Sequence, residues 1–286
     1  MNIVKRSFQW LVVLMMVVLF VRGVVAIFGG YEYAADEDYI AVLDLNGVIF
    51  DAETTIEKFR KLEDDDYAKG YVLRINSPGG LVTPSQAIYE YLLTIKKPLY
   101  VAMGSTAASG GYMAALPANR IYAMPTTITG SIGVIMQVPN YSGLYDKIGI
   151  SEQVIKSGLY KDAGNPSRPM TDEDQAVLSA IVMDMYDQFV QAVSSRRNLT
   201  DNETRTLADG RIYTGRMAMS HGLVDRMGSW YDVYLEMAKD LGTPDIKYHE
   251  IHDEVLPMWK RVMTEAEDII PTSGLNPAGF YYMLEY

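Results

Sequence analysis

Residues 71–103 read YVLRINSPGGLVTPSQAIYEYLLTIKKPLYVAM, and this stretch indicates the fold class. Residues 71–75 are a short β-rich run that ends at the turn-forming residues 76–80. Residues 84–96 carry apolar side chains at helical spacing, and residues 99–103 form the next apolar run. A strand, a turn, a helix and a second strand at this spacing predict stacked βα units, and therefore an α/β domain.

The chain on either side extends this pattern. Residues 40–50 and 120–123 predict further strands, and residues 54–63 predict a surface helix. Residues 171–197 predict the clearest helix, with Thr171 as its N-cap. The signal becomes weak after about residue 240, and the last residues, 264–286, predict a tail or an interaction arm. We therefore divide the chain into an N-terminus with a membrane segment (1–30), a linker (31–39), the α/β domain (40–240) and an extension of unassigned role (241–286).

Composition excludes several classes of function. The 286 residues are 49% hydrophobic and 21% charged, enough for one large domain or two small ones. Lys and Arg number 25 against 36 Asp and Glu, and the resulting charge of −11 disfavours nucleic acid as a partner. The absence of Cys excludes disulfides, a thiolate nucleophile and Cys-ligated metals. With only three His, histidine chemistry has few candidates, and we expect no cofactor and no metal.

Residues 8–28 read FQWLVVLMMVVLFVRGVVAIF, and Arg22 is their only charge. A helix of this length rises about 30 Å, the hydrocarbon thickness of a bilayer, so the segment predicts one transmembrane helix. Lys5 and Arg6 precede it and acidic residues follow it, which predicts a cytoplasmic N-terminus with the rest of the chain across the membrane. The alternative is a cleaved signal peptide processed near residues 24–26, but the apolar run is longer than usual for one.

Two glycine-rich segments are candidates for chemistry. In residues 76–80, NSPGG, paired glycines let main-chain N–H groups approach a ligand, and the alternative is an ordinary tight turn. Residues 104–111, GSTAASGG, resemble a nucleophile elbow from which Ser109 would project. Here the alternative is a place where two elements pack closely.

A serine nucleophile needs a base, and few side chains qualify. His221 with Asp225 would complete a Ser-His-Asp triad, but their surroundings are typical of a helix end. His249 and His252 suggest a metal site but lack a third ligand, and a solvated face explains them as well. Lys161 remains, in a loop of Gly, Asn and Pro. A lysine accepts a proton near neutral pH only where burial lowers its pKa, and a lone loop lysine is ordinarily a solvated charge.

Five motifs together resemble signal peptide peptidase A, a family of membrane-anchored Ser-Lys peptidases of bacteria. They are INSPGG (75–80), MGSTAASGGYMAA (103–115), TGSIGVI (129–135), IKSGLYKDAGNPSRPMT (155–171) and ADGRIYTGRMA (208–218). Their order and spacing fit the short form of the family and cover most of residues 40–235. The resemblance implies a crotonase-like fold, shared with the Clp protease subunit. Leu159 and Tyr160 depart from the family, which often has small or polar residues before the lysine.

The resemblance also implies the roles of individual residues. Ser109 matches the nucleophile, Lys161 the general base, and Ser131 a serine that hydrogen-bonds the lysine. Gly80 and Gly110 match the residues whose N–H groups form the oxyanion hole. Half-length chains of the family close into homo-oligomeric rings, an octamer being one candidate size, so Ser109 and Lys161 are expected to meet across a protomer boundary.

The function that follows is a membrane-anchored serine endopeptidase that hydrolyses hydrophobic peptides, such as cleaved signal peptides, outside the bacterial cytoplasmic membrane. Two other classes stay open: a catalytically degenerate scaffold or binding module, and an acyl-CoA enzyme, which the same fold also hosts. A scaffold usually loses one of the catalytic residues, and an exported domain has no supply of coenzyme A. Neither alternative predicts a reactive Ser109.

Overall fold

The computed structural model describes residues 15–16, 36–252 and 280–283. The chain divides into two compact units, one of Met1–Asp36 with His252–Leu275 and one of Glu37–Ile251 with Asn276–Tyr286. The second unit contains every predicted site residue. Within the described residues, no helix is both long and apolar enough to cross a membrane. The span predicted at residues 8–28 lies outside the described residues, apart from the two methionines at 15 and 16.

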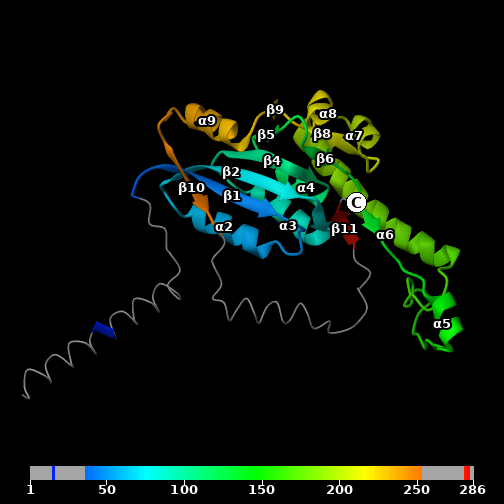
Figure 1. The fold of residues 1–286 in the computed structure, drawn as a ribbon. Helices are drawn as coiled ribbons and strands as arrows, with labels where there is room; N and C mark the ends of the chain where they lie inside the picture. The colour runs from blue at the N-terminus through cyan, green and yellow to red at the C-terminus, as the bar shows by residue number, and fades with distance from the viewer. Residues whose placement is uncertain (1–14, 17–35, 253–279, 284–286) are drawn as a thin grey trace, which may run out of the picture. The chain divides into compact units, whose positions relative to one another are not determined.

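The centre of the second unit is a sheet whose strands follow the order β10-β1-β2-β4-β5-β9 (Figure 1). The strands are β1 (Tyr39–Asn46), β2 (Ala68–Ser77), β4 (Leu99–Ala108), β5 (Arg120–Ala123), β9 (Arg226–Met227) and β10 (Lys247–Ile251). All neighbours in this order are parallel. Because parallel neighbours need crossover connections, this pairing confirms the predicted α/β class of stacked βα units.

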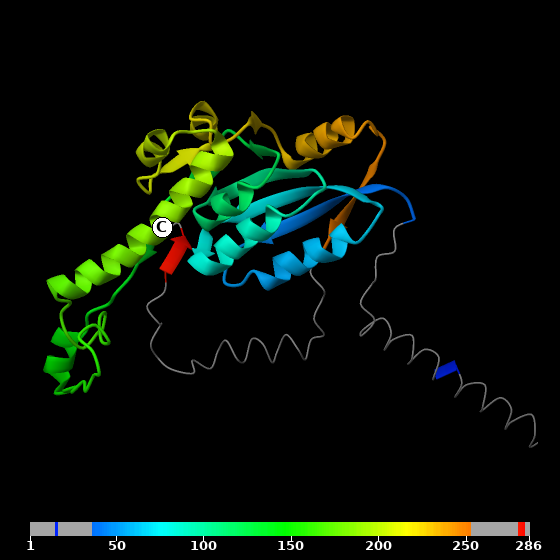
Figure 2. The same cartoon turned by 180° about the vertical axis from the view of Figure 1, so that it is seen from behind.

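Three helices cover the two faces of this sheet: α2 (Glu53–Glu63), α3 (Val82–Leu92) and α9 (Trp230–Asp240). Figures 1 and 2 show α2 and α3 on one face and α9 on the other. Phe59 of α2 and Ile88 of α3 are fully buried, and Val233 and Met237 of α9 pack in one cluster with Val72 of the sheet. Full burial of one such side chain contributes about 1.5–3 kcal/mol, so this core holds the strand ends in place.

Both central strands end in tight connections. β3 (Gly79–Leu81) follows β2 after one residue, and α4 (Gly110–Ala115) follows β4 after Ser109. The sequence predicted a strand over residues 99–103 and a nucleophile elbow within residues 104–111, but β4 continues through Ala108 because β6 (Ile128–Gly130) pairs with its end. The change of direction is therefore confined to Ser109.

Two smaller groups of strands lie beside the ends of β2 and β4. β6 also pairs antiparallel with β8 (Ile212–Thr214). β3 belongs to a second sheet in the order β3-β11-β7, with β11 (Phe280–Met283) and β7 (Ile135–Met136). Both β10 and β11 come from the region 241–286, to which the sequence assigned no role, and both belong to the same unit as the central sheet.

An arm, residues 137–183, projects from the sheet (Figures 1 and 2). It contains α5 (Ser142–Ile148) and the first turns of α6 (Asp172–Arg197). Thr171 forms a capping box with Asp174, which confirms the predicted start of α6. Large apolar side chains stand exposed along the arm: Leu144, Ile148, Ile150, Val154, Ile155, Leu159, Tyr160, Ile181 and Met183. Beyond α6 the chain continues through α7 (Asp201–Leu207) and α8 (Gly215–Ser220).

Candidate active site

Ser109 forms the bend between β4 and α4. Its backbone angles, φ 52° and ψ −118°, fall in a region that residues with a Cβ rarely adopt and that costs about 1–3 kcal/mol. Two hydrogen bonds hold the bend, because the Ser109 N–H donates to the Gly130 carbonyl at 2.7 Å and the Ser109 carbonyl accepts from Met113 at 2.9 Å. Ser109 is only 1% exposed. A strained serine between a strand and a helix is the arrangement of a nucleophile elbow.

Gly80 lies where the chain passes very close to a neighbouring segment. A Cβ built on Gly80 would lie 2.1 Å from the carbonyl oxygen of Ile49, so no other residue fits without movement of the backbone. Ile49 in turn donates to the Gly79 carbonyl at 2.9 Å and accepts from the Leu81 N–H at 2.8 Å. The Ser77 hydroxyl is buried and accepts from the Gly79 N–H at 3.1 Å. The glycine pair is therefore a main-chain requirement of this turn.

Ser131 follows β6 directly and also has a positive φ, 49°. It is 8% exposed, and its N–H donates to the carbonyl of Arg211 at 2.9 Å. The Arg211 guanidinium binds Asp209 at 2.7 Å and lowers the pKa of that carboxyl to about 2. The β6–β8 pairing thus fixes the backbone on which Ser131 sits.

Four of the five predicted site residues meet at one edge of the sheet. Gly130 pairs with Ala108, which places Ser131 beside Ser109 at the ends of β6 and β4. α4, which begins at Gly110, contacts β3, which contains Gly80. Carboxyl ends of parallel strands meet at a common edge, which is where α/β folds bind their ligands.

Lys161 is the exception. It lies in the arm, in the segment between α5 and α6, and its side chain is exposed. Among the described residues it makes no side-chain hydrogen bond or ion pair, to Ser109 or to any other group. The fold of one chain therefore assembles the glycine turns and both serines, but it does not bring the lysine to them.

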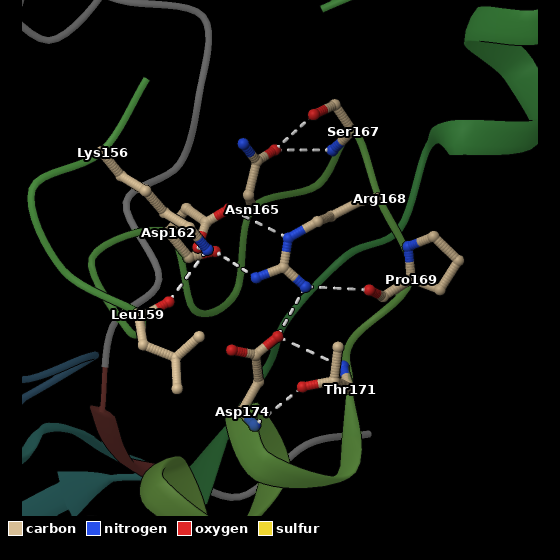
Figure 3. Close-up of polar contacts among 9 residues, drawn as sticks. All are labelled: Lys156, Leu159, Asp162, Asn165, Ser167, Arg168, Pro169, Thr171 and Asp174. Carbon is tan, nitrogen blue, oxygen red and sulfur yellow. Dashed lines mark hydrogen bonds and ion pairs between the residues drawn. The ribbon is translucent and has the colours of Figure 1, made fainter. Parts of the chain in front are cut away.

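The loop of Lys161 is nevertheless held in shape by charged groups (Figure 3). Arg168 donates to Asp162 at 3.0 Å and to Asp174 at 2.5 Å, and Lys156 donates to Asp162 at 2.5 Å. The two carboxylates are 8% and 4% exposed. Hydrogen bonds from Arg168 lower the pKa of both carboxyls, and together with Lys156 they hold the pKa of Asp162 well below its usual range. Because Asp174 lies in the first turn of α6, these contacts tie the lysine loop to that helix.

The alternative triad of His221 and Asp225 is not assembled. Asp225 accepts from the Arg197 guanidinium at 2.6 Å and from the Ile121 N–H at 2.7 Å, so its carboxylate already has two hydrogen-bond partners other than His221. His221 is the C-cap of α8, which agrees with the helix end predicted there, and its ring packs edge-to-face with that of Tyr213, the ring centroids being 5.4 Å apart.

The alternative metal site also finds no support. His249 lies in β10 and stacks on Tyr39 at 4.4 Å, and its burial lowers its pKa. Across residues 36–252 and the shorter described stretches, no three His, Asp or Glu side chains are grouped so that they could hold a metal ion.

Sequence reasoning missed three features of this region, namely the roles of Ser77 and Arg168 and the strand β11. Ser77 lies inside a recognised motif, but its role depends on a hydrogen bond that only the turn geometry defines. Arg168 also lies in a motif, and a charged residue between Asp162 and Asp174 is a weak signal for an ion-pair network. For β11 the signal was the aromatic run FYYM at 280–283, which favours a strand without naming its partners.

Two protein families match this chain. Peptidase family S49 matches residues 92–243, and the Clp protease family matches residues 40–130. The second match covers β1 to β6, which supports a ClpP-like α/β fold. A ClpP1 variant from Listeria monocytogenes aligns at 16% identity with a TM-score of 0.46, over 66% of this chain and 91% of that chain.

Several proteins of similar sequence carry protease names. The chain is 38% identical to a signal peptide peptidase SppA from Enterococcus faecium, over 73% of this chain and 65% of that protein. It is 39% identical to a protease of Methanocaldococcus jannaschii, over 78% and 75%. It is 32% identical to Protease 4 of Salmonella typhi, over 79% of this chain but 38% of that protein. The chain thus spans between about a third and three quarters of the length of these relatives.

Proposed function

Because the chain belongs to peptidase family S49, we propose that it is a serine endopeptidase with Ser109 as nucleophile and Lys161 as general base. The observation that carries this proposal is the strained, firmly held bend at Ser109, beside Ser131 and next to the glycine turn. A strained backbone that the fold holds in place is characteristic of catalytic positions.

The mechanism assigns one step to each group. Neutral Lys161 takes the proton of the Ser109 hydroxyl, and the Ser109 Oγ attacks the scissile carbonyl carbon. The N–H groups of Gly80 and Gly110 stabilise the resulting oxyanion. Protonated Lys161 then donates its proton to the leaving amine, which breaks the peptide bond and leaves an acyl-enzyme that water hydrolyses. Ser131 orients the lysine amine toward Ser109.

The lysine that serves Ser109 comes from a second copy of the chain. A lysine works as a base near neutral pH only when it is taken out of water, and Lys161 is exposed in the single chain. The arm that carries it also exposes apolar side chains, among them Ile155 at 101% and Leu159 at 65%. Packing the arm against a neighbouring protomer would bury both the apolar surface and the lysine, and repetition of this contact closes a ring.

Substrates are hydrophobic peptides such as cleaved signal peptides, and residues 8–28 anchor the chain with the catalytic unit outside the cytoplasmic membrane. A membrane location brings the enzyme to peptides that partition into the bilayer. Hydrolysis of a signal peptide at least as fast as that of a polar peptide of equal length supports this substrate class. Exclusive cleavage of polar peptides would contradict it.

The test of the dyad uses S109A and K161A, alone and co-expressed, with a fluorophosphonate probe and a peptide substrate. Each variant alone is expected to lose hydrolysis, and S109A also loses labelling. If the dyad forms between protomers, random mixing in equal amounts restores about a quarter of the sites, because a site needs one intact residue from each neighbour. Full activity of either single variant refutes the dyad. Absence of any recovery in assembled mixtures places both residues in one chain.

The alternative, a scaffold that has lost catalysis, is tested in the same experiment. A scaffold has no activated hydroxyl, so wild-type protein would label no faster than S109A. The glycine turn, both serines and the lysine are all present in the chain, which favours the peptidase.

A further inference from the structure

A pocket lies at the edge of the central sheet where β1, β2 and β4 begin. These strands run parallel, so this edge is opposite the one at which β4 ends before Ser109 (Figure 1). The pocket has a volume of about 590 Å³ and includes Leu99 and Tyr100, the first residues of β4. The length of β4 therefore separates it from Ser109 by about 30 Å, and the proposed catalytic mechanism does not use it.

The charge of the pocket contrasts with that of the whole chain, which is −11. No Asp or Glu lines the pocket, and four cationic residues do: Lys96, Lys97, Arg120 and Arg196. Arg120 forms ion pairs with Glu236 and Asp240, which compensate its charge. For the other three cations, the described residues provide no carboxylate within ion-pair distance. An anion that enters the pocket therefore meets three uncompensated positive charges.

Arg196 is oriented by main-chain contacts and keeps donors for a ligand. Its Nε donates to the Leu116 carbonyl at 3.1 Å, and its Nη2 donates to the Pro117 carbonyl at 3.0 Å. A guanidinium has five N–H groups, so three of them remain without a partner among the described residues. Lys97 differs, because its ammonium donates to the main-chain carbonyls of residues 62, 63 and 65. Lys97 therefore contributes its charge to the pocket but no further donor.

Asn119 and Lys96 supply further donors from two loops. The Asn119 Oδ1 accepts from the Leu99 N–H at 2.8 Å, so the amide nitrogen keeps both of its N–H groups. The Lys96 side chain is exposed, and its ammonium has no partner in the part of the chain that the structure describes. Glu63 accepts from the main-chain N–H of Lys96 at 3.4 Å but does not line the pocket. Donors from the loop before β4, the loop before β5 and the helix α6 thus line one pocket.

The donors and the neighbouring side chains suit a phosphate group. A phosphate accepts several hydrogen bonds at once, and hydrogen bonds from Arg or Lys to an ionised oxygen are about twice as strong as neutral ones. Apolar side chains line the pocket beside these donors, among them Ile95 and Leu93, which is 43% exposed. An anionic phospholipid presents both parts together, a charged headgroup that attracts Lys and Arg and an apolar portion next to it.

We propose that this pocket binds a phosphodiester, supplied by the headgroup of an anionic phospholipid or by a soluble ester of the same chemistry. The lipid source draws on the proposed membrane anchor. β1 begins at the same edge as the pocket, and Tyr39 follows the predicted span, residues 8–28, after about ten residues. A linker of this length reaches at most about 35 Å, so the anchor keeps this edge close to the bilayer. The site itself does not depend on the peptidase function.

The test titrates the full-length chain in a neutral detergent by isothermal titration calorimetry. One probe is dihexanoyl-phosphatidylglycerol below its critical micelle concentration, and the other is glycerophosphoglycerol, the same headgroup without acyl chains. K96E reverses a charge at the pocket, and N119D keeps the oxygen that accepts from Leu99 but replaces the two N–H groups by a second carboxylate oxygen. The matched controls are K147E in α5 and N202D in α7, which change exposed residues outside the pocket.

The expected result is that K96E and N119D each bind the lipid at least about ten-fold more weakly than wild type, because each loses a hydrogen bond to a charged group and gains a repulsive charge. K147E and N202D should bind as wild type does. Wild-type affinity in both pocket variants, equal weakening in the controls, or no saturable binding to wild type overturns the inference. Both pocket variants change exposed side chains, so their Tm should equal that of wild type. If one of them lowers Tm, the other decides the question on the same criteria.

The two probes distinguish the sources of the phosphodiester. If wild type binds the lipid at least about ten-fold more tightly than glycerophosphoglycerol, the acyl chains contribute and the source is a lipid. Equal affinity for the two probes supports the site and identifies a soluble ester as sufficient.

Labelling of Ser109 with the fluorophosphonate separates this inference from the proposed function. K96E should label at the rate of wild type, because the pocket and Ser109 are about 30 Å apart. If no protein labels, the peptidase function fails, and the titration still decides whether the pocket binds the phosphodiester. If all proteins label equally and both pocket variants bind the probes as wild type does, the peptidase stands and the phosphodiester site is wrong.

Discussion

Replacement of Gly80 by alanine tests the close approach at the glycine turn. The new Cβ would lie 2.1 Å from the Ile49 oxygen and 2.6 Å from its carbonyl carbon and nitrogen, so the backbones must separate. Separation weakens two hydrogen bonds between Ile49 and β3, at 2.9 and 2.8 Å. At about 0.5–1.5 kcal/mol for each of the two bonds and about 1–3 kcal/mol for the strain of overpacking, we expect the free energy of unfolding to fall by about 2–6 kcal/mol.

Thermal unfolding measures this loss. For a unit of about 200 residues, each kcal/mol of lost stability lowers Tm by about 2–4 °C, so G80A should unfold about 4–24 °C below wild type. Labelling of Ser109 should fall as well, since the turn carries one of the proposed oxyanion donors. The matched control is G133A, because a Cβ at Gly133 meets its nearest neighbour at an ordinary 3.6 Å. If G80A has the Tm and the labelling rate of wild type, the steric reasoning is wrong.

Three further predictions concern Arg168 and His221. R168M should lower kcat/KM by about 10²-fold, because displacement of a catalytic group by about 1 Å is enough for such a loss and Arg168 holds the loop of Lys161. The control is R216M, which alters an exposed arginine of α8 and should leave kcat/KM unchanged. Arg168 lowers the pKa of Asp162 and Asp174 in the folded protein, so wild type should have a higher Tm than R168M at any pH above about 3.9, the pKa of an aspartate in the unfolded chain. This difference in Tm should shrink as the pH falls below about 3.9, because both carboxylates then become protonated. A difference in Tm that grows in acid would contradict the reasoning. H221A should leave peptidase activity unchanged, whereas a catalytic histidine would make the loss about 10⁴-fold or more.

Local signals were sufficient for most of the fold. The alternation of β-rich runs and helical spacing in residues 71–103 predicted β2, α3 and β4, because burial on both faces of a parallel sheet requires those patterns. Boundaries shifted where tertiary pairing decided them. β4 runs five residues beyond the predicted end because β6 supports it, and part of the predicted turn at 76–80 pairs as β3.

The site was predictable to the extent that it depends on the backbone. Ser109, Ser131 and the glycine turn follow from short motifs whose strained conformations are encoded locally. Ser77 and Arg168 act through contacts that exist only after folding, so the sequence alone did not assign them. β11 was the hardest element, because a four-residue strand is defined by its neighbours β3 and β7, which lie about 200 and 145 residues earlier in the chain.

The internal contacts of the arm explain why the loop of Lys161 has a defined shape in a single chain, although Lys161 does not contact Ser109 there. Arg168 and its two carboxylates give the loop its shape from within, so the loop does not depend on Ser109 for its conformation. The exposed apolar side chains of the arm, by contrast, stabilise the protein only when another surface covers them, by about 25 cal/mol for each Å² of apolar surface that is buried. A preformed loop that lacks only a covering surface loses little conformational entropy on docking. Assembly of protomers would then complete the dyad and bury the lysine in a single step, so peptidase activity should appear at the protein concentration at which sedimentation first detects the assembly.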